Sequence, residues 1–282
     1  GLAKLQPDWL VEALPLKLWL PARAHYPIIG PLLDKVWLAY GMSWAGALYD
    51  ITIPFFLFWR RSRPLAYVAV VVFHFFTWAL FFIGVFPWIM MVCTIIFFDA
   101  KDWKSFAERF NLSGLAQFLK ASVNRQRFQQ WSKPRYKVLI ALLGVFFIVQ
   151  ALMPLRFALY PGHVLWNQEG FRFSWRVMLV EANGHLEYEL TEPSTGKKWL
   201  VYPIDYLTIA QVKQMAFQPD MILQFAHFLG EHYAKKGMQK PQVRAEVYVT
   251  LNANQSKLFV NPKVDLMKEK DTFAPKKWII QY

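Results

Sequence analysis

Residues 64–98 read PLAYVAVVVFHFFTWALFFIGVFPWIMMVCTIIFF, an uncharged run of about 35 residues that decides the class of this fold. A helix that crosses a bilayer needs about 20 apolar residues, so this run is too long for one tilted helix. Gly84 and Pro87 lie past its middle, where a helix breaks most readily. The run therefore predicts a hairpin of two membrane helices, at about 64–83 and 86–99, of which the second is short.

Two more apolar stretches flank this hairpin. One covers residues 37–59 and ends at a cluster of arginines, and the other covers 137–155 and closes at Pro154. Each stretch has the length of a membrane span. The predicted fold is a multi-span α-helical membrane bundle over residues 1–155, followed by an extracytoplasmic α+β domain over 156–282.

Basic residues between the spans predict the orientation of the chain, because cytoplasmic loops carry an excess of lysine and arginine. One basic loop follows residue 59, and residues 100–136 form the other. This second segment also has apolar residues at helical spacing, which favours an amphipathic helix on the membrane surface. If both loops face the cytoplasm, residues 1–32 and 156–282 lie on the opposite side, which in a bacterium is outside the inner membrane.

From Phe171 onward the apolar residues change to a period of two, which is typical of strands with one buried face. An Asn-Gly pair, a strong hairpin signal, follows. The elements expected in order are a strand at 171–179, a turn at Asn183-Gly184, strands at 185–190 and 198–201, helices at 208–217 and 220–235, and a hairpin of 243–251 with 258–260.

Composition excludes several classes of function. Hydrophobic residues make up 55% of the chain and aromatic residues 18%, above the values of a typical soluble domain. The net charge of +13 lies largely in loops between spans, and no nucleic-acid or zinc motif accompanies it. One cysteine, Cys93, cannot form an intrachain disulfide, and the six histidines form no ligand set. We therefore expect neither a metal nor a nucleic-acid partner.

The first candidate for chemistry is Lys4, which lies beside Leu2, Ala3 and Leu5. Desolvation there would favour the neutral amine, the form that can accept a proton. Two alternatives are a lysine that extends to the membrane interface and a lysine that pairs with Asp8.

The second candidate is His74, because an ionisable group inside a span is costly and needs a partner or water. A neutral histidine bonded to a carbonyl oxygen or to Thr77 is the alternative. The third candidate is the segment after the last span, which could hold an anionic peptide side chain or anchor the domain at the interface. Its candidate residues are Arg156, Tyr160, His163, Trp166, Arg172 and Trp175.

At these places the sequence resembles one family, the vitamin K-dependent γ-glutamyl carboxylases and their bacterial relatives. Residues 1–9, GLAKLQPDW, resemble that family's Ala-Gly-x-x-Lys-Leu-x-x-Asp-Trp stretch, and residues 49–58 and 69–75 resemble its next two membrane segments. Residues 173–178, FSWRVM, resemble its aromatic-Ser-Trp-x-Met-Met signature, and residues 261–265, NPKVD, resemble its Asp-Pro-Arg-Val-Asp. The five motifs occur in the same order and with compatible spacing.

The resemblance implies a membrane lyase that oxidises reduced vitamin K, a naphthohydroquinone, to its epoxide with O2 and carboxylates peptide glutamate with CO2. It implies that Lys4 is the base and that His74 and Trp78 line the quinol site. The third segment and Lys263 are then expected to bind a glutamate-containing peptide or protein. The resemblance also implies that earlier membrane helices, with further catalytic residues, precede Gly1.

Two positions depart from the family pattern. Lys263 replaces an arginine, so bidentate carboxylate binding is not expected there, and Phe157 replaces a histidine after the last span. Two other functions stay open. One is a quinol epoxidase or quinone-binding membrane protein without glutamate carboxylation, and the other is a non-catalytic membrane maturation factor. The presence of Lys4 argues against the second.

Overall fold

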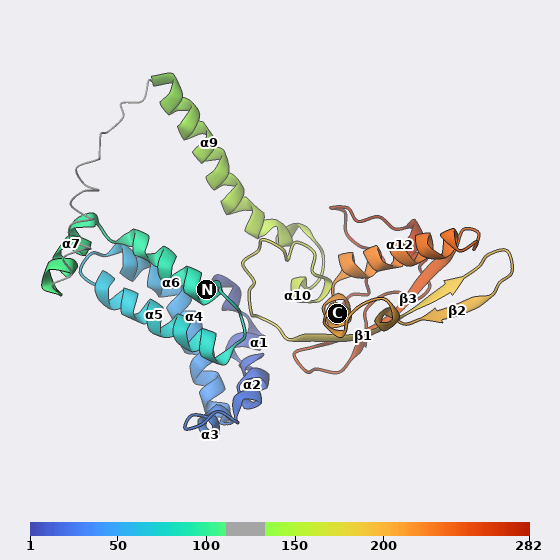
Figure 1. Cartoon of the computed structure of the whole chain (residues 1–282), viewed down its shortest axis with the longest axis horizontal. Coiled ribbons are helices and arrows are strands. Elements are labelled where there is room, and N and C mark those ends of the chain that lie inside the picture. The colour runs from blue at the N-terminus through green and yellow to red at the C-terminus, as the bar shows by residue number, and fades with distance from the viewer. Residues whose placement is uncertain (111–132) are drawn as a thin grey trace. The chain divides into compact units, whose positions relative to one another are not determined.

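The structure, a computed structural model, describes residues 1–110 and 133–282 (Figure 1). It falls into two compact units, Gly1–Val145 and Phe146–Tyr282. The amphipathic segment predicted at 100–136 is described in part. A helix, α7, covers Ala100–Arg109, whereas residues 111–132 lie outside the described part of the chain.

The first unit is helical. Its elements before the arginine cluster are η1 (Leu2–Lys4), α1 (Pro7–Leu10), α2 (Leu16–Trp19), η2 (Pro21–Arg23), α3 (Gly30–Leu33) and α4 (Val36–Phe58). Those after it are α5 (Arg63–Leu80), α6 (Phe86–Cys93), η3 (Thr94–Phe97) and α7. The predicted break in the long apolar run is confirmed, because α5 ends six residues before α6 begins and Gly84 between them has a φ of +61°.

Within the described residues, two segments are long and apolar enough to cross a membrane, Arg63–Leu80 and Tyr136–Leu159, and the apolar segment Phe86–Phe97 is shorter. Helices thus occur at all four places where spans are predicted, with α4 over the first and α9 (Lys133–Leu152) over the last. That all four cross the bilayer stays a prediction.

Small side chains on α4 let the N-terminal segment approach it closely. Ser43 and Gly46 are buried on α4, and small residues at such contacts are typical of helices that pack in membranes. The indole N–H of Trp9 donates to the Ser43 carbonyl at 2.9 Å, and the Ser43 hydroxyl donates back to the Trp9 carbonyl. These reciprocal bonds fix α1 on α4 and so place Lys4 beside it.

The two predicted basic loops meet within the first unit. Arg60 lies 3.6 Å from Asp102 of α7, and Arg63 lies 3.7 Å from the same carboxylate. Because the α5–α6 hairpin returns the chain to the arginine cluster, both loops lie at one end of the helices. This arrangement is the one that the predicted orientation requires.

The second unit carries a four-stranded antiparallel sheet in the order β2-β1-β3-β4 (Figure 1). Helix α12 lies against this sheet, and the hydroxyl of fully buried Tyr188 on β1 donates to the Ile222 carbonyl of α12 at 2.9 Å. The remaining elements, after α9, are η4 (Met153–Leu159), α10 (Val164–Asn167), β1 (Ala182–Thr191), β2 (Lys198–Val201), η5 (Pro203–Asp205), α11 (Ile209–Met215), α12 (Pro219–Lys235), β3 (Gln242–Leu251), β4 (Lys257–Leu258) and η6 (Leu266–Lys268).

Most of the expected elements of this unit are confirmed. The predicted strands at 185–190 and 198–201 correspond to β1 and β2, and the two predicted helices correspond to α11 and α12. The hairpin at its end is confirmed as well, since Tyr248 pairs with Leu258. A helical region followed by an antiparallel sheet domain is therefore the architecture of the chain.

The strand predicted at 171–179 is wrong. Phe173, Trp175 and Met178 have φ values of +63°, +57° and +55°, which interrupt an extended backbone, and the segment forms successive turns. The expected burial is also inverted. Phe173 and Trp175 are 75% and 71% exposed, whereas Ser174 between them is buried. The alternation of residue types reflects alternating turns rather than the pleat of a strand.

The turn predicted at Asn183-Gly184 is wrong too. Both residues lie inside β1 and pair with Thr250 and Val249 of β3. Gly184 is explained by a close approach, because a Cβ there would lie 2.7 Å from the carbonyl oxygen of Ala216. The glycine makes room for the end of α11 and does not form a turn.

Candidate functional site

Lys4 lies at the end of η1 and forms an ion pair across to α4. Its Nζ is 2.7 Å from Oδ2 of Asp50, and the two side chains are 14% and 28% exposed. Sequence reasoning considered Asp8 as the partner and overlooked Asp50. A carboxylate inside an apolar stretch is a signal that would have found it.

Aromatic rings surround the Lys4 amine. Nζ lies 4.9 Å from the ring centre of Trp9 and 5.9 Å from that of Phe73 on α5. Tyr49, the neighbour of Asp50, stacks on Phe73 with ring centres 3.9 Å apart. Nζ would also lie 3.6 Å from a Cβ at Gly46, so the amine sits directly over the backbone of α4. The result is an amine and a carboxylate enclosed by flat apolar surfaces.

His74 is buried beside this group, in contact with the rings of Tyr49 and Phe73. Its Nδ1 lies 2.9 Å from the carbonyl oxygen of Val70, one turn earlier. A carbonyl oxygen only accepts, so Nδ1 carries the proton, and in the neutral ring Nε2 is an acceptor. The sequence placed Trp78 with His74, but Trp78 packs against Phe75 and Trp88 of α6 and is more exposed.

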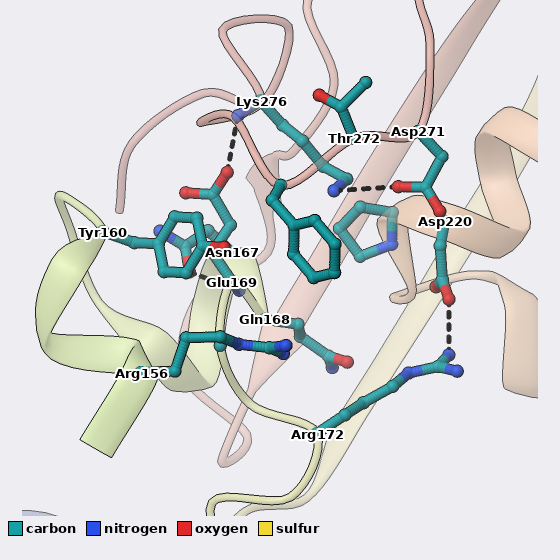
Figure 2. Close-up of a pocket in the computed structure, with 13 residues that line it drawn as sticks. Arg156, Tyr160, Asn167, Gln168, Glu169, Arg172, Asp220, Asp271, Thr272 and Lys276 are labelled. Atoms are coloured by element: carbon teal, nitrogen blue, oxygen red, sulfur yellow. Dashed lines mark hydrogen bonds and ion pairs between the residues drawn. The ribbon is translucent and has the colours of Figure 1, made fainter. Parts of the chain in front are cut away.

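A pocket of about 600 Å³ opens in the second unit (Figure 2). It brings together three of the predicted substrate-binding residues, Arg156 and Tyr160 from η4 and its end, and Arg172 from the turns that follow α10. The other charged and aromatic residues of its lining are Glu169, which is close to Arg172 in the sequence, and, from more distant parts of the chain, Asp220, Asp271, Phe273 and Lys276.

Two of the three cations in this pocket are paired with carboxylates. Arg172 lies 2.5 Å from Asp220, and Lys276 lies 3.1 Å from Asp271 (Figure 2). Arg156 differs from both. Among the described residues it has no carboxylate within ion-pair distance, and its buried Nε has no hydrogen-bond partner. Its guanidinium faces the ring of Phe273 at 5.6 Å.

The wall between Arg156 and Arg172 is held rigidly. Gly170 has a φ of +69°, and a Cβ there would lie 2.5 Å from the Cα of Phe157, so a side chain is excluded. Glu169 accepts a hydrogen bond from the backbone N–H of Lys276, which ties this wall to the C-terminal segment. Only the backbone of a glycine lets the loop pass this close to η4.

Phe157, where the resemblance leads one to expect a histidine, supports a cation. The guanidinium of Arg176 lies 4.1 Å from its ring centre, and burial lowers the pKa of that guanidinium. An arginine so placed stays charged, and the ring replaces part of its lost hydration. Phe157 therefore acts in packing here.

Four predicted site residues lie outside the pocket lining. Trp166 is buried, donates from its indole N–H to the Ile280 carbonyl at 2.8 Å and packs on Phe259. The ring of His163 faces Tyr282, Trp175 is exposed on the turns described above, and Lys263 is exposed in a turn capped by Asn261. Trp166 is thus a core residue of the second unit.

Comparison with known families divides the chain in the same way. Residues 135–282, more than half of the chain, match the model of the vitamin K-dependent gamma-carboxylase lumenal domain, and residues 1–103 match the HTTM domain. No solved structure matches the chain. The Lys4–Asp50 pair lies in the stretch that matches the HTTM domain, and the Arg156 pocket lies in the lumenal-domain match.

Proposed function

The chain belongs to the vitamin K-dependent gamma-carboxylase family, and on this premise we propose that it couples the oxidation of reduced vitamin K to the carboxylation of peptide glutamate. In this reaction the quinol is oxidised to its epoxide and O2 is reduced, with water as the other product. The γ-carbon of glutamate loses a proton and forms a bond to CO2. The observation that carries the proposal is the amine of Lys4, enclosed by rings.

The residues around Lys4 fit a flat quinol. The rings of Trp9, Tyr49 and Phe73 offer surfaces on which an aromatic ring system can pack, and Lys4 offers an amine for a phenolic hydroxyl. When bound, reduced vitamin K supplies the electrons that reduce oxygen. In this proposal Lys4 and His74 hold it, with Trp78 further out.

Each polar group there has one task. The Nζ of Lys4, as a neutral amine, accepts a proton from a quinol hydroxyl. The Nε2 of His74 is an acceptor, because Nδ1–H already donates to the Val70 carbonyl, and it orients a hydroxyl of the quinol. The surrounding rings exclude water from the proton transfer at Lys4.

The pocket of the second unit suits the peptide substrate. Arg156 carries a charge without a carboxylate partner among the described residues, and a guanidinium binds one carboxylate with two parallel hydrogen bonds. A glutamate side chain supplies that carboxylate. Tyr160 and Arg172 then line other parts of the pocket. Because Arg172 is paired with Asp220, Arg156 is the main group that attracts a single negative charge.

We further propose four membrane spans within residues 1–155, with 156–282 on the non-cytoplasmic side. The meeting of Arg60 and Arg63 with Asp102 supports this orientation, because it joins the two basic loops at one end of the helices. The lumenal-domain match supports it independently, since residues 135–282 are similar to a domain of that location.

The decisive test supplies the full protein in liposomes with reduced vitamin K, a glutamyl peptide and labelled bicarbonate. Label in the peptide, together with vitamin K epoxide, is the expected result, and a peptide with Gln in place of Glu is the control. Epoxide without label would indicate a quinol epoxidase, and neither product would indicate a non-catalytic membrane protein.

A further inference from the structure

The contact between Lys4 and Asp50 places a carboxylate against the proposed base. The distance from Nζ to Oδ2 is 2.7 Å, and Asp50 belongs to α4 whereas Lys4 belongs to η1. The reciprocal bonds of Trp9 with Ser43 fix α1, the element that follows η1, about two turns away along α4. The contact is therefore set by the packing of the unit.

A paired lysine faces a chemical constraint as a base. An ammonium cannot accept a proton, and a carboxylate at hydrogen-bond distance favours the ammonium over the neutral amine. Lys4 must therefore begin the reaction as the amine and end it as the ammonium. Asp50 interacts more strongly with the second form, so it stabilises the product of the proton transfer more than the reactant.

We propose that Asp50 is a positioning residue that receives the Lys4 ammonium and thereby makes Lys4 a stronger base; this inference rests on the proposed function. The O–H bond of the quinol breaks, an N–H bond forms at Nζ, and Asp50 remains a carboxylate that accepts a hydrogen bond from the new ammonium. Nothing is oxidised or reduced in this step.

The other titratable groups near the pair come from each neighbouring element. His74 of α5 lies within electrostatic range of Asp50. Tyr49 lies beside Asp50 on α4, and Asp8 lies on α1 next to Trp9. Asp50 forms an ion pair with Lys4 at 2.7 Å, so we expect its removal to have a large effect on the amine.

The first experiment reads the protonation of Lys4 without any quinol. Cyanate adds to neutral amines, and mass spectrometry of the full protein in liposomes follows carbamylation of Lys4 across a range of pH. Asp50→Asn should carbamylate Lys4 about tenfold faster at neutral pH, because removing an adjacent opposite charge favours the neutral amine. Asp50→Glu should resemble the wild type. Exposed Lys35 is the internal reference, and Asp34→Asn is the matched control.

The second experiment measures epoxidation against pH. In Asp50→Asn the rate should rise at lower pH than in the wild type and reach a lower plateau, with the KM for reduced vitamin K unchanged, because Lys4 becomes a weaker base. Asp50→Glu should restore most of the plateau, and this variant tests the proposal even if Asp50→Asn does not insert. An unchanged cyanate profile and an unchanged pH–rate profile in Asp50→Asn would overturn the role of Asp50. A wild type without epoxidation would instead overturn the proposed function, while the cyanate experiment still decides whether Asp50 controls the amine.

Discussion

The candidate site residue Lys4 in the first unit and the candidate site residue Arg156 in the second unit are both cations, but they differ in whether a carboxylate of the protein is paired with them. Lys4 in the first unit touches a carboxylate at 2.7 Å. Arg156 in the second lines a pocket in which the other cations, Arg172 and Lys276, are neutralised, while its own buried Nε lacks a hydrogen-bond partner among the described residues.

The difference follows from what each group must do. An amine that acts as a base becomes positively charged during the reaction, so a nearby carboxylate stabilises the ammonium that forms. A binding residue must keep its charge available until the ligand arrives, so a partner within the protein would compete. Lysine suits the role of the base, because it can lose its proton at accessible pH and arginine cannot. Arginine suits the binding role, because its planar guanidinium can form two parallel hydrogen bonds to a carboxylate.

The largest effect is expected at Lys4. Lys4→Ala should lower epoxidation and carboxylation together by about 10²- to 10⁴-fold, the usual contribution of a general base. Lys4→Arg should fail equally, since arginine stays protonated. Product assays in liposomes measure both reactions, Lys35→Ala is the matched control, and a small added amine should restore part of the activity of Lys4→Ala. Near wild-type epoxidation in an inserted Lys4→Ala protein would make Lys4 an interfacial anchor.

Arg156 should give the next largest effect. Arg156→Gln removes the charged donor that we propose binds the glutamate carboxylate. A hydrogen bond to a charged group contributes about 1.5–3 kcal/mol, so the KM for a glutamyl peptide should rise by about 10- to 100-fold. The KM for reduced vitamin K should not change. Arg172→Gln is the matched control, because its ion pair is 60% exposed on the arginine side and it should alter KM by less than about threefold. Equal effects of both substitutions would mean that pairing does not distinguish the two arginines.

The elements were predicted correctly where a sequence pattern, such as a helix breaker or an alternation of apolar residues, has a single structural cause. The break at Gly84 and the pairing of 243–251 with 258 followed from helix breakers and from a clean alternation. The predictions failed at 171–179 and at Asn183-Gly184, where a different structural cause produces the same sequence pattern. Alternating turns imitate a strand in the first case, and a glycine required by the nearby Ala216 carbonyl imitates a turn in the second.

The candidate site was predicted as separate residues and not as groups. Lys4, His74, Arg156 and Arg172 stand out by type and place, but their partners depend on tertiary contacts. Residues 271–276 approach the pocket from more than 90 residues away in the chain, and nothing local in the sequence marks them. Asp50 is the exception. A lone carboxylate within an apolar stretch is itself a functional signal, and the prediction of a span at 37–59 did not use it.

A moderate effect is expected at His74, which touches the Lys4 site without taking part in proton transfer. His74→Ala should raise the KM for reduced vitamin K several-fold and change the plateau rate less, because the loss is one of placement. Exposed His25 provides the matched control, His25→Ala, within the same unit. Loss of activity as complete as in Lys4→Ala, with the KM unchanged, would instead place His74 in the proton transfer.

The smallest effect on activity is expected from the variants that test orientation, on which the comparison of the two units depends. A lumenal pocket for peptide requires residues 156–282 on the non-cytoplasmic side, and the joined basic loops require residues 100–136 in the cytoplasm. In a Cys93→Ala background, Ser256→Cys should react with an impermeant maleimide added to intact cells, and Ser122→Cys should react only after permeabilisation. Ser256 is exposed in the connection between β3 and β4, so its replacement should leave carboxylation unchanged. Labelling at 122 and not at 256 in intact cells would reverse the orientation and place the Arg156 pocket in the cytoplasm.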